Sequence, residues 1–238
     1  MALSDAEVAR YSRQLLLPAM GEEGQERLRG ARVRVAGGGA AAAPALQYLA
    51  ASGVGTIWID DPEPIEAGDG AGWMFGPADV GRPRAAAAAE AVRDASGLVR
   101  ADVMRLGVRP TVVLACGASA DVSRAVAEEA RLLQLPHVVA EVDGEGGAVT
   151  VVPVGAPCHA CAARPGLGAD PTPAGAAVTG ALAALELVLL VTGAVQPPVG
   201  RRIEIFRGTP LARTTVRQPG CACGAAAAPR AGPGPAAP

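Results

Sequence analysis

Residues 32–60 have the sequence RVRVAGGGAAAAPALQYLAASGVGTIWID, and this stretch decides the fold. Residues 32–36 alternate as a β-strand does and run into three consecutive glycines. An alanine-rich helix is expected over 43–52, and the glycines of 53–55 end it before a second strand at 56–60. This is a βαβ unit of roughly 30 residues, the size of one nucleotide-binding half of a doubly wound sheet.

The alternation of helices and strands continues downstream of this unit. We expect helices over 85–95 and 120–132, and strands over 111–116, 137–142 and 148–154. Strands that alternate with helices imply a mostly parallel sheet covered by helices on both faces. The predicted class is therefore α/β, with a doubly wound, Rossmann-like sheet.

The N-terminal and C-terminal parts add three further elements. Residues 4–7, SDAE, form a capping-box pattern that begins a helical arm carrying Arg10 and Arg13. Residues 164–175 are rich in Gly and Pro and predict a mobile crossover loop. The apolar stretch 177–192 predicts a buried helix that is too short to span a membrane.

Composition excludes two classes of partner. The chain has 21 Lys and Arg against 23 Asp and Glu and only 3% aromatics, so it lacks the basic block and stacking platforms of nucleic-acid binders. It has no uninterrupted apolar run of about 18 residues and no signal-peptide pattern, so we expect no membrane partner and a cytoplasmic location. We expect one domain over 1–224, followed by a disordered Ala/Pro/Gly tail over 225–238.

The glycine run and one aspartate are candidates for nucleotide binding. Gly37 and Gly39 fit a G-x-G start, and glycines at this position let a phosphate approach a helix N-terminus. Alanines follow, so only part of the fingerprint is present, and a tight turn without a ligand is the alternative. Asp61 follows the second strand and could accept the ribose hydroxyls; a solvated turn carboxylate is equally compatible with the sequence.

Four of the five cysteines form two tight pairs. Cys158 and Cys161 make a C-x-x-C knuckle, and Cys221 and Cys223 make a C-x-C pair far downstream. Four thiolates can hold a structural zinc ion in tetrahedral geometry, which is the expectation for a reducing compartment. The single residue in C-x-C limits how well both sulfurs can face one ion, so free or disulfide-linked cysteines are the alternative.

In order and spacing, these pieces resemble the ThiF/MoeB/HesA family of ubiquitin-activating-enzyme-like adenylyltransferases over residues 4–224. Residues 9–15, ARYSRQL, are similar to the family's R-Y-x-R-Q arm, and 47–55, QYLAASGVG, to its segment after the glycine loop. Residues 80–84, VGRPR, look like its V-G-x-P-K, and 219–224, PGCACG, like its closing zinc knuckle.

The resemblance implies a function and a set of site residues. In that family, ATP adenylates the C-terminal Gly-Gly of a ubiquitin-like sulfur carrier, within a homodimer whose N-terminal arginine reaches the partner's nucleotide. Arg13 would be that arginine, Asp61 the ribose ligand, and Gly37 and Gly39 part of the phosphate loop. Arg84 would stand where the family has a lysine, and a planar guanidinium is not interchangeable with an ammonium.

The sequence also departs from the family at the ATP and magnesium ligands. The N-L-x-R-Q block, with its phosphate-binding arginine, falls on 69–73, where no arginine is present. The magnesium-binding aspartate falls on Ala118, which cannot hold a metal. An arginine of this kind is typically worth about 10³ to 10⁵ in rate, so we expect little adenylation. Arg82 and Asp121 are candidates to replace the missing arginine and aspartate.

Three functions remain open at this stage. The first is a degenerate protein that binds a carrier, or forms the inactive half of a heterodimer with an intact paralogue. The second is an ATP-dependent adenylyltransferase that activates a Gly-Gly-ended carrier with rearranged ligands. The third, a dinucleotide-dependent oxidoreductase, is disfavoured by the cysteine pairs and the R-Y-x-R-Q arm.

Overall fold

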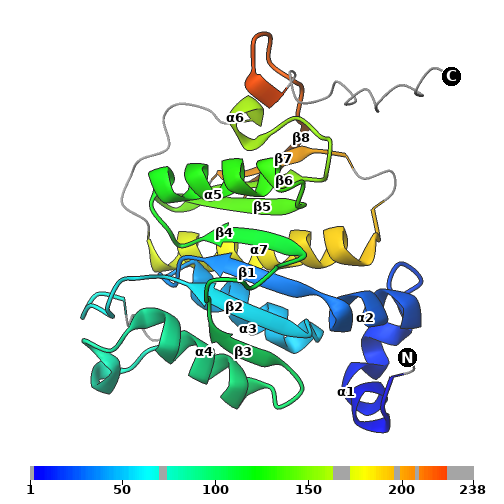
Figure 1. The fold of residues 1–238 in the computed structure, drawn as a ribbon, viewed down its shortest axis with the longest axis vertical. Coiled ribbons are helices and arrows are strands. Elements are labelled where there is room, and N and C mark those ends of the chain that lie inside the picture. Colours follow the sequence, from blue (N-terminus) through cyan, green and yellow to red (C-terminus); the bar gives the residue numbers. More distant parts are fainter. Residues whose placement is uncertain (1–2, 70–73, 163–171, 196–198, 207–208, 224–238) are drawn as a thin grey trace, which may run out of the picture.

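The computed structural model describes residues 3–69, 74–162, 172–195, 199–206 and 209–223. They build one eight-stranded sheet with the strand order β3-β2-β1-β4-β5-β6-β7-β8 (Figure 1). The strands are β1 (Arg32–Ala36), β2 (Thr56–Asp60), β3 (Arg100–Val103), β4 (Val112–Cys116), β5 (His137–Asp143), β6 (Gly146–Val152), β7 (Arg201–Phe206) and β8 (Thr209–Thr214). The sheet is parallel from β3 to β5 and antiparallel from β5 to β8. The predicted α/β class with a mostly parallel sheet is confirmed.

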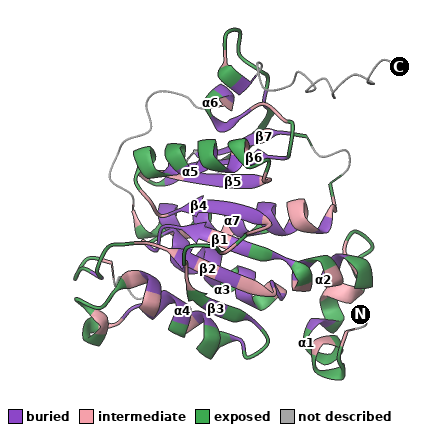
Figure 2. Ribbon diagram, in the orientation of Figure 1, coloured by how far each residue is buried: buried purple, intermediate pink, exposed green. Residues whose placement is uncertain are grey.

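Helices pack on both sides of this sheet. The described helices are α1 (Asp5–Leu15), α2 (Gly21–Gly30), α3 (Ala42–Ser52), the 3-10 turn η1 (Pro77–Asp79), α4 (Arg84–Ala95), α5 (Ala120–Leu132), α6 (His159–Ala162) and α7 (Pro173–Thr192). On one face, α3 packs against α4 and α7, and these helices enclose the main apolar core. On the other face, α5 lies over β4 and β5 and encloses a smaller core (Figure 2).

The predicted βαβ unit is present with its boundaries within one residue. Val33, Val35, Ile57 and Ile59 are fully buried because the strands place every second side chain against the helices. Gly53 ends α3 in the left-handed conformation, with φ of 86°, as a helix-terminating glycine does.

The arm helix α1 begins as predicted and docks at the far end of α3. The capping box between Ser4 and Glu7 is present. Tyr11 is buried against Gly53, where an added Cβ would lie 2.6 Å from the tyrosine Cζ. The Gln14 amide donates to the carbonyl oxygen of Ser52 at 3.3 Å. The arm is therefore fixed at the C-terminal end of α3.

Helix α7 corrects one expectation. It begins at Pro173, four residues earlier than predicted, because Thr172 caps it through its side chain and proline suits the first turn. With 20 residues and a mean hydropathy of 2.1, it is long and apolar enough to cross a membrane, so the prediction that it is too short is wrong. Half of the helix's apolar 18-residue stretch is buried in the protein, as in the core helix of a globular domain.

Several elements were not predicted. These are the charged helix α2 and the strands β3, β7 and β8; β3 and β7 do alternate between charged and apolar side chains, but they are short and carry several charges. The expected cover of helices on both faces is also incomplete, because the connection from β3 to β4 contains no helix. Most of the predicted crossover loop, 164–171, and the predicted tail, 225–238, lie outside the described residues.

Candidate functional site

The glycine turn and Asp61 meet at the carboxyl edge of the sheet, because β1 and β2 are parallel neighbours. Gly37 has φ of 101°, and a Cβ there would lie 2.5 Å from the carbonyl oxygen of Cys116. A Cβ on Gly39 would lie 2.9 Å from the carbonyl oxygen of Gly117. Both glycines are thus required for close packing against the turn after β4, whether or not a ligand binds.

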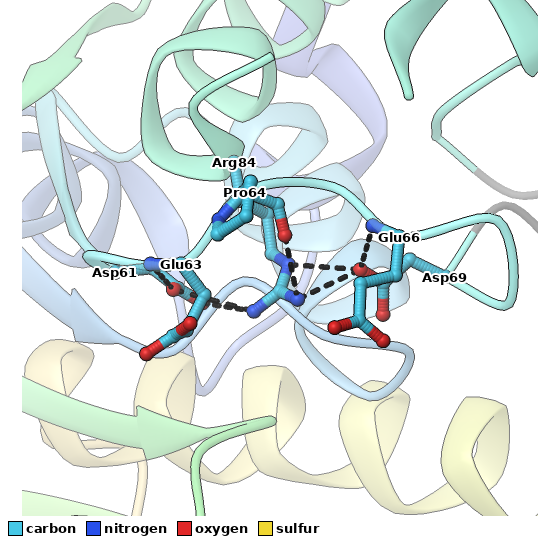
Figure 3. Close-up of polar contacts among 6 residues, drawn as sticks. All are labelled: Asp61, Glu63, Pro64, Glu66, Asp69 and Arg84. Atoms are coloured by element: carbon cyan, nitrogen blue, oxygen red, sulfur yellow. Dashed lines mark hydrogen bonds and ion pairs between the residues drawn. The ribbon is translucent and has the colours of Figure 1, made fainter. Parts of the chain in front are cut away.

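Arg84, at the start of α4, is held beside the glycine turn by two carboxylates (Figure 3). Its Nη1 donates to Asp61 at 3.0 Å, and its Nη2 donates to Asp69 at 2.7 Å. Its Nε also donates to Asp69 at 3.2 Å, and its Nη2 donates to the carbonyl oxygen of Pro64 at 3.1 Å. All three guanidinium nitrogens therefore have a partner within the protein.

The stem of Arg84 also covers the glycine turn. A Cβ on Gly38 would lie 2.9 Å from the Cδ of Arg84 and 3.1 Å from Oδ2 of Asp61. The side chains of Arg84 and Asp61 are only 12% and 5% exposed, so Asp61 is not a solvated turn residue. Ribose hydroxyls would have to compete with a buried ion pair for this carboxylate.

The two carboxylates are themselves held by their own loops. Asp61 accepts the backbone N–H of Glu63 at 2.9 Å, and Asp69 accepts that of Glu66 at 2.9 Å. Burial acts to lower the pKa of Arg84, but its hydrogen bonds to Asp69 and Asp61 outweigh burial and raise this pKa above its ordinary value. We refer to Asp61, Asp69 and Arg84 as the arginine clamp.

The proposed substitutes for the missing ligands lie in surface ion pairs. Asp121 has a side chain that is 89% exposed and pairs with Arg124 at 3.1 Å. Arg82 pairs with Asp79 at 2.5 Å and also with Glu90. Neither side chain contacts the glycine turn through any interaction found in the described part of the chain. Of the block at 69–73, residues 70–73 lie outside that part.

Arg13 lies too far from its own glycine turn to act there. It is an exposed residue in the last turn of α1, which docks at the C-terminal end of α3. The glycine turn precedes the N-terminal end of α3, and an 11-residue helix is about 16 Å long. Within the residues that the structure describes, Arg13 has no ion-pair partner.

The four paired cysteines come together at the opposite end of the sheet from β3. Their sulfurs all lie within 4.8 Å of one another, with 3.5 Å between Cys158 and Cys221 and 3.6 Å between Cys161 and Cys223. Around a tetrahedral zinc ion with Zn–S bonds of about 2.3 Å, sulfurs are about 3.8 Å apart, so the cluster fits such an ion. All five cysteines are free, so no disulfide is present.

The protein supports this cluster with backbone hydrogen bonds. The N–H of Gln218 donates to the sulfur of Cys161 at 3.4 Å, an arrangement that orients a thiolate ligand. Burial raises the pKa of Cys158 to about 12. Burial also acts to raise the pKa of Cys223, but hydrogen bonds from the Cys158 backbone and the neighbouring thiols lower it to about 6. These hydrogen bonds favour the thiolate form of Cys223, which is the form in which cysteine binds a metal ion.

Sequence reasoning missed Asp69 as a member of the site. The resemblance places it only at the start of a block whose arginine is missing, whereas the structure pairs it with Arg84. The available signal was Arg84 in VGRPR, because a guanidinium group has several donors and can bind two carboxylates at once. Arg84 and Asp61, which the sequence did single out, are brought together.

The fold and the site define a ThiF-type α/β protein. A model of the ThiF family matches residues 11–224, and the chain belongs to this family. The adenylyltransferase and sulfurtransferase MOCS3 of Bos taurus is 35% identical, over 94% of this chain and 54% of its own length. The sulfur carrier protein adenylyltransferase of Thermus thermophilus is 38% identical, over 43% of this chain and 38% of its own length. The chain thus spans about half or less of these relatives.

A solved structure has the same fold. E. coli MccB, in a crystal structure with MccA, superimposes with a TM-score of 0.77 at 18% identity, over 90% of this chain and 73% of its own. At this identity the likeness establishes the architecture alone.

Proposed function

We propose that this protein binds the C-terminal Gly-Gly of a ubiquitin-like sulfur-carrier protein and adenylates it weakly or not at all. The carrier is supported by the family membership and by relatives named as adenylyltransferases, one of them of a sulfur carrier protein. The loss of catalysis is supported above all by the arginine clamp, which occupies the carboxylate expected to bind ribose. Ala118, whose backbone lies against Gly37, offers no metal ligand.

The runner-up is an ATP-dependent adenylyltransferase with rearranged ligands. One observation favours it: no side chain caps α3, so only the carbonyl oxygen of Gly39, which accepts the N–H groups of Ala42 at 2.9 Å and Ala43 at 3.4 Å, would compete with a phosphate for these amides. This function would require Asp121 and Arg82 to leave their surface pairs, each of which is worth only about 0 to 1 kcal/mol. It would also require the arginine clamp to open, and the side chains of the clamp are much less exposed than those of the surface pairs.

The carrier assignment is tested by binding without nucleotide. Calorimetry with a small sulfur-carrier protein ending in Gly-Gly should give saturable binding. Removing the carrier's two terminal glycines should weaken this binding by about tenfold or more, or roughly 1.4 kcal/mol. Equal binding of the full-length and shortened carriers would contradict recognition of the Gly-Gly end.

We further propose that the four clustered cysteines hold a structural zinc ion in a cytoplasmic protein. A closed set of four thiolates is typical of structural rather than catalytic zinc. The ion would join the C-x-x-C knuckle, in which Cys158 precedes α6 and Cys161 lies within it, to the downstream C-x-C pair, and so anchor the chain after β8.

We also propose that Arg13 serves a neighbouring subunit, either in a homodimer or in a heterodimer with an intact paralogue. Its own glycine turn lies at the other end of α3, so any contact of Arg13 with a nucleotide requires a second chain. A chain that has lost its own ATP ligands could still contribute this arginine in trans.

The trans role predicts a gain of function in a mixture. Adding this protein to an intact paralogue should raise adenylation of the carrier, and Arg13→Ala should remove the gain while the complex still assembles. Because an arginine acting in trans is typically worth about 10³ to 10⁵ in rate, the effect should be large. The matched control is Arg10→Ala on the same exposed helix. If Arg13→Ala stimulates as well as the wild type does, Arg13 has no role in the partner's site.

A further inference from the structure

The connection between β3 and β4 is unusually short for the path it takes. β3 is an edge strand, and β2 and β1 lie between it and β4. The chain crosses both strands in residues 104–111, without a helix. Parallel strands are normally joined by a dozen or more residues, usually including a helix that covers the sheet. Figure 1 shows this connection as a single thread on the near side of the sheet.

The short connection leaves side chains of three strands exposed on that side. Two rows of register partners cross β1, β2 and β3 there, and we call these six residues the open face. They are Arg32, Thr56 and Arg100 in one row, and Arg34, Trp58 and Asp102 in the other. Ile57 and Ile59, on the opposite side of β2, are fully buried, whereas Trp58 is only half-buried. A parallel sheet that is normally buried on both faces is therefore covered on one face only in this region.

Apolar side chains lie beside the open face. Leu106, in the connection, is fully exposed at 104%, and Leu133, just after α5, is 60% exposed. Met104, Val108 and Leu133 line a cavity of about 70 Å³ together with Arg34. Leu133 and Arg34 line the same cavity, and Arg34 is the register partner of Trp58. Exposed apolar side chains gathered in one region in this way are typical of a surface that receives a partner.

Positive charge is in excess in this region. Arg34 is paired with Asp60 at 2.6 Å and with Glu129 at 2.8 Å. Arg105 is paired with Asp102 at 3.2 Å. By contrast, Arg32, Arg100 and Arg109 make no ion pair with a carboxylate in the described ranges. Arg32 donates only to a backbone oxygen, at 2.9 Å.

We infer that the open face binds an amphipathic helix of a partner protein, with an apolar stripe flanked by acidic residues. The helix would take the place that a crossover helix normally occupies, with its apolar stripe on Trp58 and Leu106. Its carboxylates would meet the unpaired arginines. Nucleic acid fits less well, because Trp58 is the only aromatic side chain of the open face, and single-stranded nucleic acid is bound by several stacking side chains along a basic groove. This inference does not depend on the nucleotide site or on the carrier.

The test uses Trp58 as the reporter. In a Trp73→Phe variant, Trp58 is the only tryptophan of the chain. The probe is a helix-stapled synthetic peptide of about 14 residues, roughly 21 Å long, with leucines along one stripe and glutamates on both flanks. We expect a saturable change in Trp58 fluorescence. A scrambled peptide and a peptide with lysine in place of glutamate should bind about tenfold more weakly or worse.

Two variants and a control locate the binding. Leu106→Ser and Arg100→Glu, both at exposed positions, should each weaken peptide binding by about tenfold while the thermal unfolding curve is unchanged. Arg213→Glu, on the exposed strand β8, should bind the peptide as the parent does. The inference fails if no peptide binds up to about 1 mM, if the scrambled or lysine peptide binds equally, or if the variants have no effect. It also fails if Leu106→Ser dissolves a dimer of this chain, or if Arg100→Glu abolishes binding of single-stranded RNA instead.

Discussion

The purified protein should show no magnesium-dependent ATP–pyrophosphate exchange with a carrier ending in Gly-Gly. Adenylation needs a phosphate-binding arginine and a magnesium ligand, and the arginine alone is typically worth about 10³ to 10⁵ in rate. Here Ala118 stands where the resemblance places the aspartate, and Arg84 is held by Asp61 and Asp69. Exchange of radiolabelled pyrophosphate into ATP measures the reaction directly.

Two variants make this prediction decisive. Ala118→Asp combined with Arg84→Lys restores two of the expected ligands, and it should raise exchange above that of the wild type. Asp121→Ala is the matched test of rescue, because Asp121 is the nearest acidic residue in the following helix. Robust exchange by the wild type that disappears in Asp121→Ala would establish the adenylyltransferase and contradict the proposal of lost catalysis.

The second large effect concerns the cysteine cluster. Purified protein should contain about one zinc ion per chain, and Cys158→Ser should release it. Apparent binding free energies of structural zinc are about 10 to 16 kcal/mol near neutral pH, so losing one ligand should loosen the segment after β8 or unfold the domain. Elemental analysis and thermal unfolding measure the two consequences.

Cys116→Ala is the control for this experiment. Cys116 is buried in β4, outside the cluster, and burial raises its pKa to about 12, so it stays a neutral thiol. The variant should keep its zinc. Wild-type protein without zinc and with four freely titrating thiols would contradict the metal site.

The sequence predicted those parts of the fold whose side chains repeat with a clear period. The unit from β1 to β2 has alternating strands, an alanine-rich helix and a terminating glycine, and it was placed within one residue. The cysteine cluster was also predictable, because two close pairs of thiols at C-x-x-C and C-x-C spacing are typical of a metal site. Both features depend on local patterns that tertiary packing does not override.

The remaining features depend on contacts between distant segments. β7 contains Arg202, which is buried with Glu141 and Thr150 as partners, so its sequence lacks the continuous apolar run of a strand that is buried on both faces. The open face could not be predicted because β3 itself was missed. The arginine clamp is visible only once the loop after β2 brings Asp69 to α4.

Calorimetric titration with ATP, with and without magnesium, tests the central claim that the arginine clamp closes the nucleotide site. Wild-type protein should bind ATP weakly and without any magnesium dependence. Arg84→Lys should bind about tenfold more tightly, because a lysine cannot hold Asp61 and Asp69 together as the guanidinium fork does. Arg82→Lys, in a surface ion pair, should bind as the wild type does. Tight, magnesium-strengthened binding by the wild type, or weaker binding by Arg84→Lys, would contradict the account.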